Sequence, residues 1–423
     1  MTAIITFIIV FGLIVLVHEF GHYYWAKRSG ILVRQFSIGM GPKLVSYTKN
    51  HTLYTIRLLP LGGYVMMAGL EDDDADLKPG TVVRLKLNEV GVVECLDCSG
   101  ADDDATLIPL QVTQSDLQEE LFITGYLQDE SETLRRFEVD HDAVIVDQNR
   151  TALQIAPRDV QFNSASLLNR FLTNLAGPFN NIVFGILVSI LGVFLLGGAP
   201  SNSNQVGTVT AHSPAAQAQL KPGERILQVN HKKINSWTQL SQSLNRYPKQ
   251  KVQLKVQDKQ KKIRTVQVRL NEVRQGGQRT GQLGITESLN SDLGATFKYG
   301  LYSAGQNIMT IIMALKQMVT GGFNLNQLGG PVAIYSETSQ VAALGWKSVV
   351  LFIAWLSINL GIMNLLPIPA LDGGKLLLNL IEALRRKPVS PKTEMVINLV
   401  GVGFLLLLMV AVTWNDITRF FIK

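Results

Sequence analysis

The feature that most constrains this chain is a pair of histidines at the end of an uncharged apolar stretch near the N-terminus. His18 and His22 enclose Glu19 in the sequence His-Glu-Phe-Gly-His, and residues 3–17 before them carry no charge. Histidines four positions apart lie on one face of a helix, so both imidazoles can reach one metal ion. Glu19 lies beside that face, where a carboxylate can accept a proton from a water molecule that the metal activates. The motif therefore predicts a metal site within a hydrophobic helix.

A second interpretation of the motif needs no metal. The stretch could be an amphipathic turn at a membrane surface, with both histidines as interfacial polar groups and Glu19 as a solvated charge. Ionisable side chains at membrane depth are costly and commonly functional. This cost favours the metal site, and the rest of the chain has to support it.

The composition and the distribution of charge are typical of an integral membrane protein. Apolar residues make up 47% of the 423 residues, charged residues make up 17%, and the mean hydropathy is +0.18. Apolar runs near 3–17, 182–199, 348–366 and 395–413 predict four membrane-spanning helices. Because the chain is largely embedded, its net charge of +6 suits anionic lipid surfaces, and we expect no nucleic-acid partner.

The orientation follows from the short basic loop at 384–388, which joins the last two predicted spans. Such loops stay in the cytoplasm, which places segment 27–170 inside, segment 200–340 outside and both termini outside the cell. The Lys-rich stretch 249–264 belongs to a long soluble segment, and these translocate largely regardless of charge. The first helix lacks a basic start and a small-residue cleavage site, so we expect it to be retained. The predicted location is the cell (plasma) membrane.

Two short β-prone runs follow the first helix. Lys43–Tyr47 and Leu53–Leu59 flank a polar turn, which predicts a hairpin. Its apolar content suggests that it dips into the membrane near the histidines, although an ordinary surface hairpin fits this stretch equally well. An exposed strand edge there could hold an extended peptide by main-chain hydrogen bonds. The residues predicted to do so are Leu53, Tyr54, Thr55 and Ile56.

Residues 71–165 have the composition of a separate insert. Acidic clusters at 71–76 and 102–104 separate short runs of Val, Leu and Ile, which predicts a small, mostly β module. Cys95 and Cys98 are the only cysteines of the chain. A structural zinc site normally needs four ligands, so we expect reduced thiols here.

The head of the second span and the segment after it carry further signals. Asn181, in Ala-Gly-Pro-Phe-Asn-Asn, either caps this span or lines the site, and the two interpretations are equally good. Beyond the span, the pattern from Ser213 to Asn230 resembles the core of a PDZ domain, with Glu224 in place of the usual Asp and His231 in place of the final Gly. PDZ domains bind peptide ends by strand addition. The predicted carboxylate-binding turn of this groove consists of Gly207, Thr208 and Val209.

A second chemical motif interrupts the third apolar run. It consists of Asn364, Pro367, Pro369 and Asp372, followed by two glycines. Broken helices at membrane depth persist only where they line a cavity or a protein interior. Asp372 and the two histidines would leave zinc a fourth position for water; alternatively, Asp372 only caps the following helix. His18 lies roughly 22 Å of helix from the outer end of its span, and Asp372 follows a span that also enters from outside, so both motifs fall towards the inner face.

These motifs, in this order, resemble those of the site-2 proteases, intramembrane zinc metalloproteases, and specifically their bacterial RseP/RasP branch. One PDZ domain and the insert are closer to the Gram-positive members. The resemblance implies that His18, His22 and Asp372 bind one Zn²⁺ per chain and that Glu19 is catalytic. The residues expected to bind or orient the substrate are Asn364, Asn181, Pro367 and Pro369, together with the hairpin edge.

The resemblance also implies the partners. The expected substrates are single-span membrane proteins such as anti-sigma factors and remnant signal peptides, cut in regulated intramembrane proteolysis. An upstream site-1-type protease would trim them first, and the PDZ domain would act as a size filter. Membrane lipid surrounds the enzyme. The rival functions are a non-catalytic membrane PDZ scaffold with a structural metal and a metal transporter; four spans with no further acids at membrane depth give a poor path for ions.

The sequence thus predicts a polytopic α-helical membrane protein with four transmembrane helices, a membrane-associated β-hairpin, a small mostly-β cytoplasmic insert and an extracytoplasmic PDZ domain. The predicted segments are the first transmembrane helix (1–28), the hairpin (29–70), the insert (71–165), the second transmembrane helix (171–199), the PDZ domain (204–287), an amphipathic interfacial segment (297–340), the third transmembrane segment (348–386) and the fourth (394–415).

Overall fold

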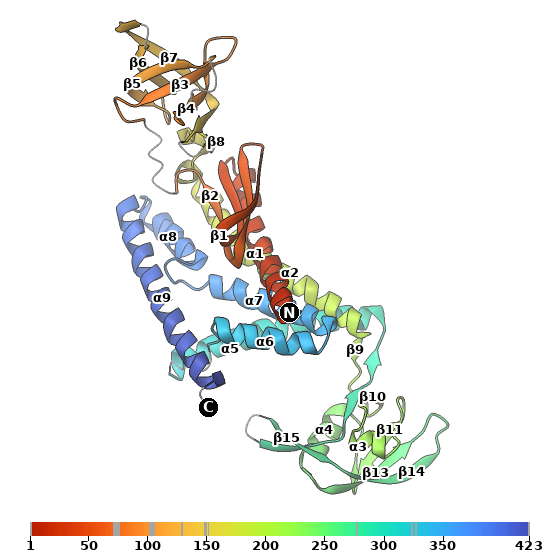
Figure 1. Ribbon diagram of the computed structural model, residues 1–423. Helices are drawn as coiled ribbons and strands as arrows, with labels where there is room; N and C mark the ends of the chain where they lie inside the picture. The colour runs from red at the N-terminus through yellow and green to blue at the C-terminus, as the bar shows by residue number, and fades with distance from the viewer. Residues whose placement is uncertain are drawn as a thin grey trace. The chain divides into compact units, whose positions relative to one another are not determined.

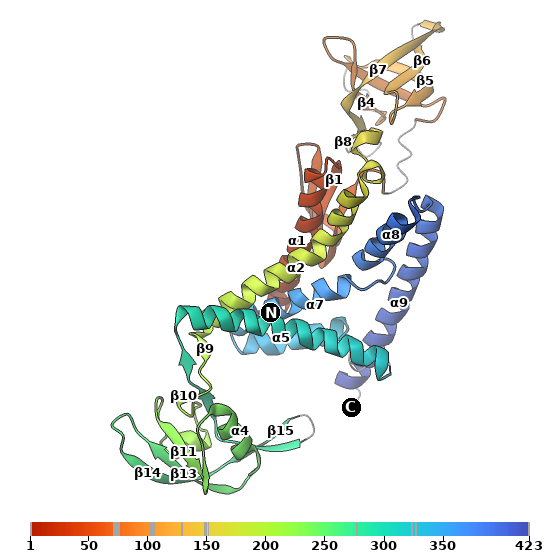
Figure 2. The ribbon, with the colours of Figure 1, turned by 180° about the vertical axis from the view of Figure 1, so that it is seen from behind.

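The computed structural model of the protein describes residues 2–70, 77–100, 106–127, 130–147, 150, 152–275, 278–322, 325 and 328–421 (Figures 1 and 2). The predicted acidic clusters at 71–76 and 102–104 lie outside these residues. Two compact units make up the chain: residues 1–186 with 307–423 form the first, and residues 187–306 form the second.

Long helices dominate the chain outside its β modules. They are α1 (Thr2–Arg28), α2 (Leu167–Leu196), α5 (Leu293–Thr320), α6 (Pro331–Ala343), α7 (Trp346–Asn364), α8 (Asp372–Arg385) and α9 (Pro391–Phe421). Within the described residues, four helical stretches are long and apolar enough to cross a membrane, namely Ala3–Arg28, Leu167–Leu196, Trp346–Asn364 and Lys392–Arg419. This number agrees with the four predicted spans. The predicted third segment consists of two helices, because α7 ends at Asn364 and α8 begins only at Asp372.

Glycines bring α2 and α7 into backbone contact. A Cβ on Gly361 of α7 would lie 2.8 Å from the carbonyl oxygen of Pro178, and a Cβ on Gly185 of α2 would lie 2.8 Å from that of Ala354. Only glycine permits such an approach, because a real Cβ atom lies more than 3 Å from the atoms it packs against. Small residues commonly serve this purpose between helices in lipid.

The predicted hairpin is longer and more folded than expected. β1 (Val33–Lys49) and β2 (Thr52–Met67) are long strands that bend near Gly39, Gly41 and Gly62, whose φ angles of 85°, 84° and 80° favour glycine. Each strand therefore contributes two runs to the pairing. Run 43–49 pairs with run 52–57, and run 33–38 pairs both with 53–56 and with 63–67.

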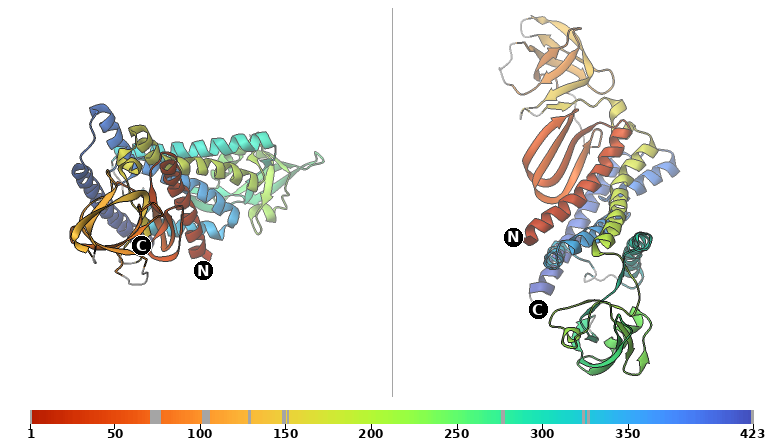
Figure 3. Two further views of the ribbon diagram at one scale, coloured as in Figure 1. Left: turned by 90° about the horizontal axis from the view of Figure 1, so that it is seen from above. Right: turned by 90° about the vertical axis from the view of Figure 1, so that its right-hand side faces the viewer.

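This pairing corrects the predicted position of the strand edge. Leu53, Tyr54, Thr55 and Ile56 pair on both sides, with Gln35–Ile38 and with residues 45–48, so they form an interior strand and the predicted edge is wrong. In the described part of the sheet, runs 43–49 and 63–67 pair on one side only. The sheet packs on α1 through Ala26, Ile31, Val33 and Met67, and it lies beside this helix in Figure 3.

The insert is a small β module with its own core. Its strands are β3 (Val82–Leu87), β4 (Val93–Asp97), β5 (Ile108–Asp116), β6 (Phe122–Leu127), β7 (Glu130–Val146) and β8 (Ala152–Gln154), followed by short 3-10 turns at Arg158–Val160 and Phe162–Ser164. The sheet runs β4-β3-β5-β6-β7-β8, and an additional β4–β7 pairing closes it on itself. Buried aliphatic side chains such as Leu85, Leu96 and Leu110 fill the interior.

Two polar features of the insert stand out. Cys95 and Cys98 are free and half-buried, and burial raises the pKa of both thiols, that of Cys98 to about 11. His141 lies between two carboxylates: Nδ1 is 3.0 Å from Asp142 Oδ1, and Nε2 is 3.1 Å from the carboxylate of Asp159. The hydrogen bond with Asp142 and then that with Asp159 raise the pKa of His141.

The second unit contains a β module between the ends of α2 and α5. Its strands are β9 (Ala199–Pro200), β10 (Val206–Val209), β11 (Arg225–Val229), β12 (Lys232–Lys233), β13 (Lys251–Gln257), β14 (Ile263–Arg269), β15 (Asn271–Gln275), β16 (Gln278–Gln282), β17 (Ile285–Glu287) and β18 (Leu289–Asn290). A four-stranded sheet, β12-β11-β13-β14, covers a core that includes Ile226, Leu240 and Leu254. The helices α3 (Pro214–Gln217) and α4 (Trp237–Asn245) start at the serine N-caps Ser213 and Ser236.

Candidate metal centre

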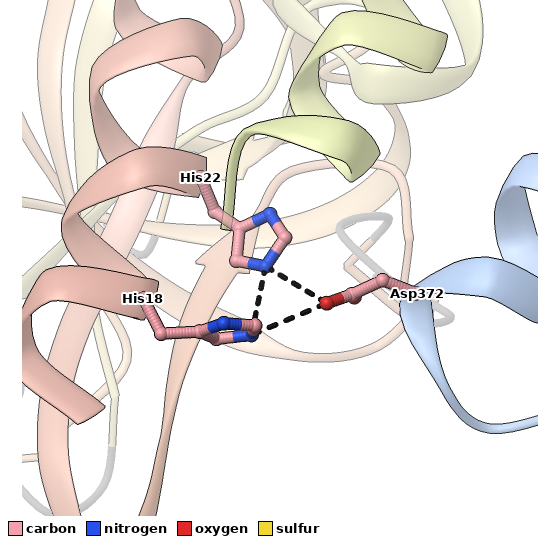
Figure 4. Close-up of side chains that lie close together, drawn as sticks. All are labelled: His18, His22 and Asp372. Carbon is pink, nitrogen blue, oxygen red and sulfur yellow. Dashed lines mark hydrogen bonds and ion pairs between the residues drawn. The ribbon is translucent and has the colours of Figure 1, made fainter. Parts of the chain in front are cut away.

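Helix α1 places both predicted histidines towards the same point. The Nε2 atoms of His18 and His22 lie 3.3 Å apart (Figure 4). Asp372 reaches this point from the start of α8, and its Oδ2 lies 3.2 Å from His18 Nε2 and 3.3 Å from His22 Nε2. All three side chains are at least 87% buried. The structure therefore brings Asp372 together with two histidines that are far from it in the sequence.

This cluster fits a metal ion. His18, His22 and Asp372 each offer one ligand atom, and these atoms all lie within 4.8 Å of one another. Two imidazoles and one carboxylate are a common zinc ligand set, with a further position left for water. Asp372 Oδ2 is buried and has no hydrogen-bond donor within the described residues, which a cation between the three atoms would explain. The alternative role as a helix cap is wrong, because the N-cap of α8 is Leu371.

The turn before α8 fixes Asp372 through very close backbone contacts. A Cβ on Gly373 would lie 2.2 Å from the carbonyl oxygen of Leu366, and one on Gly374 would lie 2.4 Å from that of Ile368. On the other side of the turn, a Cβ on Gly401 of α9 would lie 2.5 Å from Pro369. The two glycines after the aspartate are thus required for the turn to fold onto itself.

Helix α2 supports the histidines from behind. His22 Nδ1 lies 2.7 Å from the main-chain oxygen of Thr173, a buried contact that needs a hydrogen on Nδ1 and leaves Nε2 free to bind a metal. Gly177, one turn further along, makes room for this ring, since a Cβ there would lie 2.2 Å from His22 Nε2. Likewise, a Cβ on Gly21 would lie 2.4 Å from the oxygen of Ala176.

Asn181 contacts the other histidine, His18. This residue is fully buried, and its amide nitrogen lies 3.3 Å from His18 Nδ1, while its Oδ1 lacks a partner within the described residues. The side chain thus lines the site, as one of its two predicted roles requires. Ser357 Oγ of α7 donates to the main-chain oxygen of Asn181 at 2.8 Å, which ties α7 to the same point of α2.

Glu19 lies where α1 meets the sheet. Its side chain is 8% exposed, and a Cβ on Gly63 would lie 2.8 Å from Glu19 Cγ and 2.6 Å from the oxygen of Ser37. The part of the sheet that reaches the Glu19 side chain is therefore the start of run 63–67. Leu53–Ile56, predicted to bind the substrate as a strand edge, lie inside the sheet instead.

The remaining predicted residues lie around the turn and in the second unit. The side chain of Asn364 donates to the oxygen of Leu360 at 3.1 Å, so its hydrogen bond stays within α7, and Pro367 and Pro369 lie in the turn between α7 and α8. Gly207, Thr208 and Val209 form strand β10 rather than the predicted turn, and Thr208 N donates to Thr286 Oγ1.

Together, the four apolar helices and the cluster of ligand atoms fit a membrane-embedded metallohydrolase. Comparisons with known proteins make this assignment specific. Residues 6–408 match the profile of peptidase family M50, and the chain belongs to this family, the site-2 proteases. It is 47% identical over 427 residues to a protein named as a zinc metalloprotease from Streptococcus pyogenes serotype M3, and 46% identical over 424 residues to one named protease eep from Enterococcus faecalis. Each alignment covers 100% of both chains.

These relatives confirm the predicted family and the predicted enzyme class, a zinc metalloprotease, over the scaffold and the transporter. Among solved structures, the PDZ domain of an SdrC-like protein from Listeria monocytogenes is 20% identical and covers 20% of this chain and 87% of that chain, with a TM-score of 0.18.

Proposed function

We propose that the protein is an intramembrane zinc endopeptidase that hydrolyses a peptide bond within the transmembrane segment of a single-span substrate. One observation carries this proposal. The three ligand atoms of His18, His22 and Asp372 converge beside Glu19, in the second half of a helix that is long and apolar enough to cross a membrane. A single Zn²⁺ per chain fits this ligand set.

The neighbours of the histidines prepare them to bind metal. The main-chain oxygen of Thr173 accepts a hydrogen bond from His22 Nδ1, so the proton of this ring stays on Nδ1 and Nε2 is free. If the amide of Asn181 is turned so that Oδ1 accepts from His18 Nδ1, the buried oxygen gains a partner and His18 Nε2 also becomes free. Both rings then present lone pairs to the same point, and the Asp372 carboxylate supplies the negative charge that a cation needs there.

Glu19 is the proposed general base. Zinc, when bound, would lower the pKa of a water molecule and polarise the scissile carbonyl. Glu19 would accept the proton of the attacking water and pass it to the leaving nitrogen. Its low exposure keeps bulk water away from the carboxylate, and its closeness to run 63–67 positions it beside an extended peptide.

A helical substrate hides its carbonyl groups in hydrogen bonds and has to unwind before it can be cut. We propose that the unwound segment pairs with the free edge at run 63–67, which starts beside Glu19 and pairs on one side only in the described sheet. Asn364, Pro367 and Pro369 would line the opposite side of the substrate.

The proposed setting is the plasma membrane, with both termini outside and the insert in the cytoplasm. The β module of the second unit would be a PDZ domain that admits substrates already trimmed by a site-1-type protease. The resemblance to site-2 proteases supports anti-sigma factors and remnant signal peptides as substrates in regulated intramembrane proteolysis.

Two substitutions in reconstituted protein test the proposal. Glu19→Gln should keep its zinc and lose cleavage of a single-span reporter, because only the base is removed. Asp372→Asn should lose zinc as well, because a ligand is removed. Glu120→Gln, on the exposed surface of the insert, is the control and should change neither. Cleavage by the Glu19 variant at the wild-type rate would refute the assigned roles.

A further inference from the structure

An ion pair far from the metal ligands joins the two helices on which the site depends. Arg170 Nη2 of α2 lies 2.6 Å from Glu382 Oε1 of α8, and each side chain is 14% exposed. Helix α2 holds His22 through Thr173, one turn after Arg170. Helix α8 carries Asp372, and Glu382 lies about 15 Å further along it.

Both charges are placed unfavourably for their own helices. Arg170 lies in the first turn of α2 and Glu382 in the last turn of α8. A helix N-terminus disfavours a cation and a C-terminus disfavours an anion, because of the orientation of the peptide dipoles. Either residue alone would destabilise its helix end, and a mostly buried charge without a partner is costly. The pair is therefore the reason that either residue is tolerated.

Asp372 needs such support more than the histidines do. His18 and His22 share one helix, so their spacing is set by α1 itself. Asp372 stands at the start of a separate helix that is connected to α7 by the turn 365–371. A small tilt of α8 would move the carboxylate away from the histidines, and a displacement of about 1 Å is enough to impair a catalytic site by about 100-fold.

We infer that the Arg170–Glu382 ion pair is a clamp that holds α8 against α2 so that Asp372 meets the two histidines. Both residues are positioning residues for the metal site. The inference rests on the proposed metal-binding role of Asp372. It predicts that the geometry of the metal site depends on a contact that touches no ligand.

The test is a double-mutant cycle on the full-length protein in detergent. Arg170→Gln and Glu382→Gln should each weaken Zn²⁺ affinity by about tenfold or more, because a tilt of α8 that moves Asp372 by about 1 Å takes the carboxylate out of position. The exchanged pair, R170E with E382R, should recover most of this loss, since it restores the ion pair and places each charge favourably for its helix dipole. Affinity is measured by competition with a chelator on metal-free protein.

A second measurement needs neither metal nor activity. Hydrogen exchange of the α8 amides in metal-free protein should accelerate in both single variants and return towards the wild-type rate in the exchanged pair. The control is the exposed pair Arg136–Glu120 of the insert, 57% and 66% exposed, whose glutamine variants should change neither readout.

The outcomes separate this inference from the proposed function. If wild-type protein does not bind zinc, the proposed metal site is refuted. The hydrogen-exchange rates of the α8 amides would still test whether the Arg170–Glu382 ion pair holds α8 in place. Single variants with unchanged affinity and unchanged α8 exchange, or an exchanged pair that recovers nothing, would overturn the clamp itself.

Discussion

Replacing Gly177 by alanine tests whether the close contact between α1 and α2 sets the metal geometry. The new Cβ would lie 2.2 Å from His22 Nε2 and 2.7 Å from the two adjacent ring carbons. Ordinary carbon contacts need ~3.5 Å, so the ring or the helix has to move by about 1 Å. The ring cannot simply rotate away, because its other nitrogen is held by Thr173 at 2.7 Å. We expect the imidazole to leave the ligand cluster.

A displacement of this size corresponds to a loss of about 100-fold in the cleavage rate, or roughly 2.7 kcal/mol of activation free energy. The assay is cleavage of a single-span reporter in proteoliposomes, with bound zinc measured by mass spectrometry. Gly12→Ala, in α1, is the matched control, because the added Cβ meets no other described residue within 4 Å beyond its own stretch of helix. If Gly177→Ala keeps wild-type zinc content and cleaves within about twofold of wild type, the reasoning is refuted.

Three further predictions concern Gly63, Cys98 and His141. Gly63→Ala places a Cβ 2.8 Å from Glu19 Cγ and should lower kcat by about tenfold or more while zinc content stays constant; unchanged kcat in reporter cleavage would argue against Glu19 beside this strand. The raised pKa of Cys98, about 11, predicts slow alkylation by iodoacetamide at pH 7.4 and faster alkylation towards pH 10, followed by mass spectrometry; rapid labelling at neutral pH would contradict it. The pKa of His141 is raised, so the protonated imidazole stabilises the folded insert. This stabilisation is complete below about pH 6.5 and is lost as the pH rises through the raised pKa. Hydrogen exchange of β7 should therefore accelerate with pH beyond the intrinsic rate in wild type but not in His141→Gln; equal behaviour would exclude the effect.

The cluster of His18, His22 and Asp372 could be predicted because these residue types are rare in apolar stretches. Two histidines at helical spacing and one aspartate within a broken apolar run are signals that composition and periodicity carry. The support from α2 is different. Thr173 acts through its main-chain oxygen, which no residue type announces, and Gly177 gives only the general signal of a close approach.

The position of the strand edge could not be predicted from the sequence, for a different reason. Alternation with period two locates strands, but it does not show that β1 and β2 each bend and pair twice. The signals for the bends are Gly39, Gly41 and Gly62, with positive φ angles. Glycines have several uses in strands, so these could not fix which run lies at the edge.

The large separation in sequence between Asp372 and the two histidines has a consequence for biosynthesis. A ribosome releases His18 and His22 well before Asp372, because 350 positions separate residues 22 and 372. On the proposed mechanism, a nascent chain threaded into the bilayer lacks the third ligand and cannot cut its neighbours. On that mechanism cleavage can begin only after α8 has been synthesised, so the order of synthesis delays proteolysis until the helices before α8 are available.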